Sequence, residues 1–134
     1  MYCHKCYNMY SQSSHKDVKA LGCTSLNCAS LKSIIVMGIL DKFVVNATNK
    51  AMKNSYIDCT LKLHFGDDQI TSALKSWQNA HYIVASNQML FALNVARQCS
   101  TQLLKFRLSP ALGNELRTLQ GFYKAANGVF KQIH

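Results

Sequence analysis

The first 28 residues hold four cysteines whose spacing suggests metal chemistry. They form two close pairs, Cys3 with Cys6 and Cys23 with Cys28. Thiolates a few residues apart can bind one ion, and the longer segment between the pairs can close a tetrahedral structural site. The spacing therefore predicts Zn²⁺ held by Cys3, Cys6, Cys23 and Cys28.

The arrangement around these pairs resembles a zinc knuckle, although the spacer between Cys23 and Cys28 is wider than usual. A helix is expected to begin directly after Cys28, and this is similar to treble-clef modules, whose second ligand pair lies at a helix start. A helix N-terminus also favours a thiolate. His4 and His15 are spare nitrogen donors, and we interpret both as surface histidines.

Three other interpretations of the cysteines remain open. Disulfides would suit a secreted domain, but the N-terminal residues are polar rather than an apolar signal segment, so we expect an intracellular protein, nuclear or cytoplasmic. A redox dithiol at Cys3 and Cys6 would usually follow a strand, which is missing here. Reduced, buried cysteines would simply act as small apolar side chains.

The composition favours one helical domain. The chain has 134 residues, of which 49% are apolar, with one proline and six glycines. A chain of this length can bury a core without needing a metal for its whole stability, and so few turn-forming residues favour long helices. No apolar run reaches the length of a membrane span, so we expect a soluble protein with no membrane partner.

The periodicity of the apolar residues changes along the chain. Helical spacing extends from about Ala29 to Lys53. From Tyr56 to Phe65 apolar and polar residues alternate, which predicts a strand with one buried face. Helical spacing then returns near 68–80 and 82–106, and Pro110 is expected at the first position of a closing helix.

The predicted fold is mainly α (α+β). It combines an N-terminal zinc-knuckle or treble-clef-like segment, one β-strand near 56–65, and three to four helices packed as a small bundle. Residues 1–28 would be the cysteine-rich zinc-binding segment and 29–134 the helical body, together one compact unit. The strand needs a hydrogen-bonding partner, which would be the cysteine-rich segment or a second copy of the chain.

The formal net charge of +9 suggests phosphate binding, with the excess at the two ends of the chain. The residues expected to bind nucleic acid are Lys5, Lys16, Lys19, Lys32, Arg117, Lys124 and Lys131. Nothing in the sequence separates DNA from RNA. A solvated basic surface with no nucleic-acid partner is the alternative.

The sequence contains no glycine-rich phosphate loop, His-Glu-x-x-His motif or Gly-x-Ser-x-Gly motif, so we expect no enzyme activity. The leading hypothesis is a small basic intracellular zinc-binding protein that binds nucleic acid. The alternative is a structural or assembly subunit, which would bind a protein partner or form a homodimer through its zinc segment and exposed strand.

Overall fold

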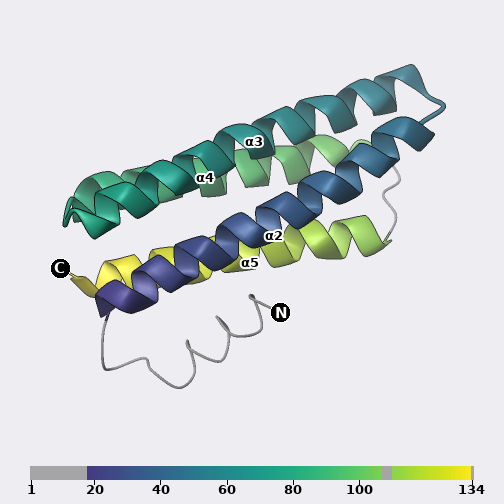
Figure 1. Ribbon diagram of the computed structural model, residues 1–134. Coiled ribbons are helices and arrows are strands. Elements are labelled where there is room, and N and C mark those ends of the chain that lie inside the picture. The colour runs from purple at the N-terminus through teal and green to yellow at the C-terminus, as the bar shows by residue number, and fades with distance from the viewer. Residues whose placement is uncertain (1–17, 107–109, 134) are drawn as a thin grey trace.

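Within residues 18–106 and 110–133, four long α-helices make up most of the structure (Figure 1). The computed structural model describes residues 18–106 and 110–133. The helices are α2 (Val18–Asn46), α3 (Lys50–Gln78), α4 (Tyr82–Leu103) and α5 (Pro110–Phe130), and a short 3₁₀ turn, η1 (Lys131–Ile133), follows. Short connections make consecutive helices antiparallel, as in other four-helix bundles. In Figure 1, α3 and α4 form one layer, and α2 and α5 form the other.

Each helix contacts two neighbours, so the bundle is closed: α2 packs on α3, α3 on α4, α4 on α5, and α5 on α2. The apolar faces meet in one core. Its largest buried side chains are Trp77, Tyr123, Phe130, Leu26, Leu40, Leu63, Ile70, Met89, Leu103, Leu112, Leu116 and Leu119. Fully burying a large apolar side chain contributes about 1.5–3 kcal/mol, so this core is the main source of stability.

Trp77 fixes how closely α2 approaches the rest of the bundle. Its ring stacks on Phe130 at a centroid distance of 4.1 Å, and Tyr82 meets it edge-on at 4.9 Å. On its α2 side lies Gly22, where an added Cβ atom would be only 2.2 Å from the indole ring. The glycine at this position therefore allows close contact between α2 and α3.

The strand predicted near residues 56–65 is wrong, because these residues lie inside α3. Their apolar side chains form two separate stripes, each with helical spacing. One stripe is buried (Cys59, Leu63), and the other is exposed (Ile57, Leu61, Phe65). The mainly α (α+β) fold with one strand is thus corrected to a four-helix bundle, and residues 18–106 and 110–133 contain no strand.

The zinc-knuckle or treble-clef-like segment is also contradicted. Cys23 and Cys28 both lie within α2, which continues without interruption through the expected boundary between residues 28 and 29. Residues five positions apart on an α-helix point about 140° away from each other. The two side chains therefore do not converge on one ion as a hairpin pair would.

Two predicted helix boundaries are confirmed. α3 ends at Gln78 and α4 begins at Tyr82, which matches the break expected between residues 80 and 82. Pro110 is the first residue of α5. Proline is favoured there because the first N–H groups of a helix have no intrahelical acceptor.

Ala80 occupies a position where glycine is usual. It has a positive φ of 63° in the turn after α3. The Ala80 N–H donates to the Trp77 carbonyl at 3.1 Å, and the His81 N–H donates to the Ser76 carbonyl at 2.8 Å. These two bonds form a Schellman motif, in which the left-handed residue is most often glycine.

We expect Ala80→Gly to raise the free energy of unfolding by about 1 kcal/mol, because glycine adopts the left-handed conformation without a Cβ penalty. Chemical denaturation of the purified protein measures the change. Ala51→Gly, at an exposed position within α3, is the control and is expected to lower stability. If Ala80→Gly were as destabilising as the control, the left-handed turn would be absent.

Candidate functional site

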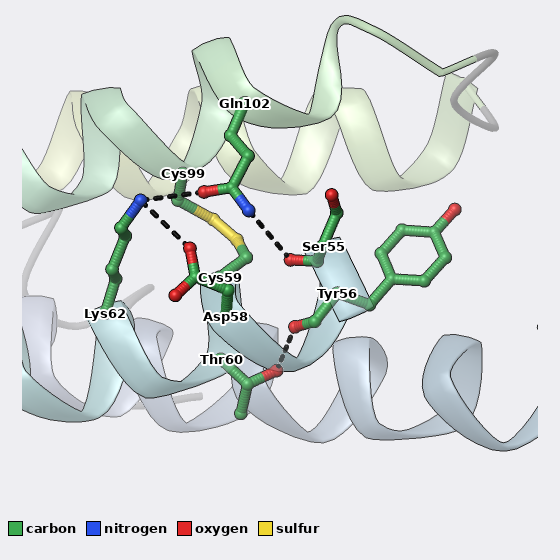
Figure 2. Close-up of a disulfide and its surroundings, with 8 residues drawn as sticks. All are labelled: Ser55, Tyr56, Asp58, Cys59, Thr60, Lys62, Cys99 and Gln102. Carbon is green, nitrogen blue, oxygen red and sulfur yellow. Dashed lines mark hydrogen bonds and ion pairs between the residues drawn. A yellow bond between two sulfur atoms is a disulfide. The ribbon is translucent and has the colours of Figure 1, made fainter. Parts of the chain in front are cut away.

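A disulfide joins the first half of α3 to the C-terminal part of α4 (Figure 2). It links Cys59 and Cys99, which are 40 residues apart in sequence and have Cα atoms 4.8 Å apart. Both cysteines are fully buried. The bond holds the two helices in one register, and therefore fixes the relative positions of the side chains on their outer face.

Lys62 lies beside this disulfide and connects the two helices through polar contacts (Figure 2). Its Nζ is 3.1 Å from Asp58 Oδ2 and donates a hydrogen bond to Gln102 Oε1 at 2.7 Å. Gln102 Nε2 in turn donates to the Ser55 backbone carbonyl at 3.3 Å. The hydrogen bond from Lys62 holds the pKa of Asp58 below its usual value.

An apolar groove opens next to these contacts. Its main side chains are Leu61 and Phe65 of α3 and Phe91 of α4, which are 59%, 64% and 46% exposed. Asp58, Lys62 and Val95 complete a lining that encloses about 290 Å³. Large exposed apolar side chains gathered in one place mark binding sites more often than scattered ones do.

A polar groove of about 690 Å³ runs along the same two helices. It is lined by Ser55, Lys62, Asn94, Arg97, Gln98, Thr101, Gln102 and Lys105. Lys62 lines both grooves, so they share a border. We name the combined surface of the two grooves the α3–α4 face. It offers apolar contact and hydrogen-bonding groups, which suits binding rather than bond-breaking chemistry.

The prediction of a zinc-binding protein is contradicted. Within residues 18–106 and 110–133, no group of three or more histidine, cysteine or acidic residues is placed to hold a metal ion. Cys28 is disulfide-bonded, and Cys23 is half-buried and packs against the core. Cys3 and Cys6 lie outside the described residues, so the role of these two cysteines stays a prediction.

The predicted nucleic-acid-binding residues are spread over α2, α5, η1 and the part of the chain outside the described residues. Lys5 and Lys16 lie outside the described residues, and Lys19 lies in α2. Lys32 forms an ion pair with Glu115 across α2 and α5. Arg117 and Lys124 on α5 and Lys131 in η1 are exposed. These three residues follow one another at intervals of seven positions, and their role in binding nucleic acid stays a prediction.

A separate polar contact lies between α2 and α3. Ser30 Oγ donates to Asp67 Oδ1 at 2.7 Å. Burial raises the pKa of Asp67 above its usual value, and the hydrogen bond from Ser30 offsets part of this effect. Asp67 joins helices within the bundle and is not part of the α3–α4 face, so we assign it a structural role.

We expect the Asp67 carboxylate to make stability depend on pH. Its pKa is higher in the folded chain than in the unfolded chain. Its contribution to stability is therefore complete below the pKa of the unfolded chain, and it is lost as pH rises through the pKa of the folded chain. Asp67→Asn should remove this loss while keeping an acceptor for Ser30. Melting temperatures measured from acidic to neutral pH test this prediction. Asp41→Asn is the control, and its melting temperature should depend on pH as that of the wild type does.

Comparison with known proteins identifies the fold. No protein-family model and no curated protein matches the sequence. The chain is similar to the crystal structure of a pectin methylesterase inhibitor from Arabidopsis thaliana, with a TM-score of 0.81 and 13% identity over 93% of this chain and 85% of that one. It is also similar to the crystal structure of a mutant form A of a pectin methylesterase inhibitor from Arabidopsis. That comparison has a TM-score of 0.85 and 13% identity, and it covers 94% of this chain and 85% of the other.

These similarities establish the fold. The chain has the four-helix architecture of the two inhibitors across nearly all of its length. Both solved structures are enzyme inhibitors and not enzymes, which agrees with the prediction that this chain has no enzyme activity. None of the helices in residues 18–106 and 110–133 is long and apolar enough to cross a membrane.

The same findings correct the predicted function and location. A zinc-binding protein that recognises nucleic acid is contradicted by the inhibitor-like fold and by the lack of a metal-binding group in the described residues. The alternative of an assembly subunit relied on an exposed strand and is wrong in that respect, since these residues lie inside α3. Its expectation of a protein partner agrees with the inhibitor-like fold. The nuclear or cytoplasmic location is contradicted by the Cys59–Cys99 disulfide, since disulfides are rare in those compartments.

The sequence does not predict the α3–α4 face. Its alternation from Tyr56 to Phe65 puts Leu61 and Phe65 on the buried face of a strand. Arg97 and Lys105 were not among the predicted binding residues. One signal was available: Ile57, Leu61 and Phe65 are spaced four apart and form a second apolar stripe on a helix that already has a buried one.

Proposed function

We propose that the chain is a secreted protein inhibitor that binds an enzyme through its α3–α4 face, and that pectin methylesterase is the enzyme class to which it binds. The observation that carries the proposal is the exposed apolar groove of Leu61, Phe65 and Phe91, built on two helices that a disulfide joins. The fold shared with two pectin methylesterase inhibitors supports it.

The energetics of the groove suit a protein partner. Leucine and phenylalanine side chains that are about half exposed keep a large apolar area to bury on contact, and such burial is favourable by about 25 cal/mol per Å². Aromatic side chains near the centre of an interface often carry much of the binding energy. The disulfide limits the relative motion of α3 and α4, so little order is lost on binding.

The disulfide also supports the secreted location. Cys59 and Cys99 are buried and joined. Disulfides of this kind form in oxidising compartments such as the secretory pathway. The partner enzyme is therefore expected outside the cell or within that pathway.

Phe65→Gln tests the groove directly. We expect wild-type protein to inhibit a pectin methylesterase and Phe65→Gln to inhibit at least about thirtyfold less well, which corresponds to a central contact of about 2 kcal/mol. Folding should be unaffected, because Phe65 is exposed and surface substitutions change stability by about 0.5 kcal/mol or less. The measurement is an inhibition constant from enzyme titration.

Val45→Gln is the matched control, since Val45 is exposed on α2, away from the groove. It should inhibit as well as the wild type. Wild-type protein that leaves pectin methylesterase fully active would refute the enzyme assignment. Equal inhibition by wild type and Phe65→Gln would instead refute the role of the groove.

A further inference from the structure

The polar groove has an uneven distribution of charge. Its lining includes the cations Lys62, Arg97 and Lys105, together with amide and hydroxyl side chains, and none of these lining side chains is acidic. Across residues 18–106 and 110–133, neither Arg97 nor Lys105 takes part in an ion pair. The groove therefore presents two unpaired positive charges beside neutral hydrogen-bonding groups.

Lys62 is placed differently from these two cations. Its ammonium group is already held by Asp58 and Gln102, and only 31% of its side chain is exposed. Because Lys62 lines the polar groove and the apolar groove, it marks the border between them. A ligand that lies along α3 and α4 would therefore meet positive charge at one end and apolar side chains at the other.

We propose that the polar groove binds carboxylate side chains of an acidic segment in the protein partner, with an apolar side chain of the same segment entering the groove of Phe65 and Phe91. The inference rests on the proposed function and adds the chemistry of the partner. The Arg97 guanidinium can bind a carboxylate through two parallel hydrogen bonds. Charge complementarity of this kind mainly raises the association rate and the specificity.

A titration followed by NMR tests the charge preference without the enzyme. The full oxidised chain, labelled with ¹⁵N, is mixed with a short peptide in which aspartate and glutamate flank leucine and phenylalanine. The matched peptide carries asparagine and glutamine instead. We expect the acidic peptide to shift signals from Lys62, Arg97 and neighbouring residues and to bind about tenfold more tightly at low salt, with the difference reduced at high salt.

Charge-reversal variants show whether the acidic peptide binds at the polar groove or responds only to the net charge of the chain. The double variant Arg97→Glu with Lys105→Glu should bind the acidic peptide about tenfold more weakly. The control is Lys124→Glu with Lys131→Glu, which changes the net charge equally at exposed positions on α5 and η1. It should bind as the wild type does. Equal losses in the two double variants would overturn the proposal, since net charge alone would then explain binding.

Two further results would overturn it. One is equal affinity for the acidic and amide peptides. The other is tighter binding of oligogalacturonate at the same residues, which would assign the groove to an acidic carbohydrate. Inhibition of pectin methylesterase is measured in a separate assay. Wild-type protein that does not inhibit the enzyme refutes the proposed function, whereas the peptide titration decides whether the polar groove prefers carboxylates.

Discussion

Replacing Cys59 and Cys99 together by alanine is expected to lower the free energy of unfolding by about 4 kcal/mol, because the disulfide closes a loop of about 40 residues in the unfolded chain. Without the bond, the unfolded chain gains the conformations that the link forbids. Both side chains are buried, and alanine leaves no polar group unsatisfied there. Urea denaturation of the wild type and the double variant measures the difference.

Cys23→Ala is the control for this prediction. Cys23 is half-buried and packs at the margin of the core, so its replacement should cost about 1 kcal/mol or less. A double variant at Cys59 and Cys99 with nearly wild-type stability would show that the bond does not form. In that case an oxidising compartment would no longer be expected for this chain.

Gly22→Ala is expected to destabilise the bundle by about 3 kcal/mol or more, at the upper end of the usual cost of overpacking a core. A Cβ atom at this position would lie 2.2 Å from Trp77. The indole ring cannot easily move aside, because it stacks on Phe130 and meets Tyr82 edge-on. Either the ring or the N-terminal part of α2 must therefore shift. Thermal denaturation measures the loss.

Gly38→Ala is the matched substitution in the same helix. No atom lies within 4 Å of a Cβ added at Gly38, and the residue is exposed. Alanine favours helix by up to about 1 kcal/mol over glycine, so this variant should be as stable as the wild type or more stable. Equal tolerance of alanine at both glycines would contradict the packing of α2 against Trp77.

The last two helices were predicted from the sequence because helical spacing reflects the buried face directly. The helix expected from Ala29 to Lys53 is wrong, since α2 ends at Asn46 and α3 begins at Lys50. In the closing helix expected after Pro110, the series Leu112, Leu116, Leu119 and Tyr123 has helical spacing and is buried. Pro110 and the turn after Gln78 also fall at their predicted places. These features depend on short-range physics: proline lacks an N–H group, and apolar side chains that share one helix face are buried together.

The strand error has a specific cause. Two stripes of residues four apart, offset by two positions, produce the same pattern as alternation in a strand. Cys59 and Leu63 belong to one stripe, and Leu61 and Phe65 belong to the other. Periodicity alone cannot separate these cases over ten residues. The second stripe is apolar but exposed, and no rule based on burial predicts an exposed stripe.

The disulfide and the α3–α4 face depend on long-range geometry. Cys59 and Cys99 are both buried, but their pairing requires the register of α3 against α4. The same register brings Lys62 to Gln102. The short spacing between Cys23 and Cys28 favoured a zinc site, because ligand spacing is a local feature of the sequence. The helix that separates their side chains depends on residues far beyond this pair, since α2 extends to Asn46.

Hydrogen exchange on the complex with a pectin methylesterase is the most direct test of the α3–α4 face as an inhibitory surface. The full oxidised chain is compared with and without the enzyme. We predict slower exchange in residues 55–65 of α3 and in residues 91–105, which run from α4 into the turn that follows it, because the two grooves lie there. Exchange along the outer faces of α2 and α5 should be unchanged. Absence of a complex, or protection confined to α2 and α5, would contradict the account.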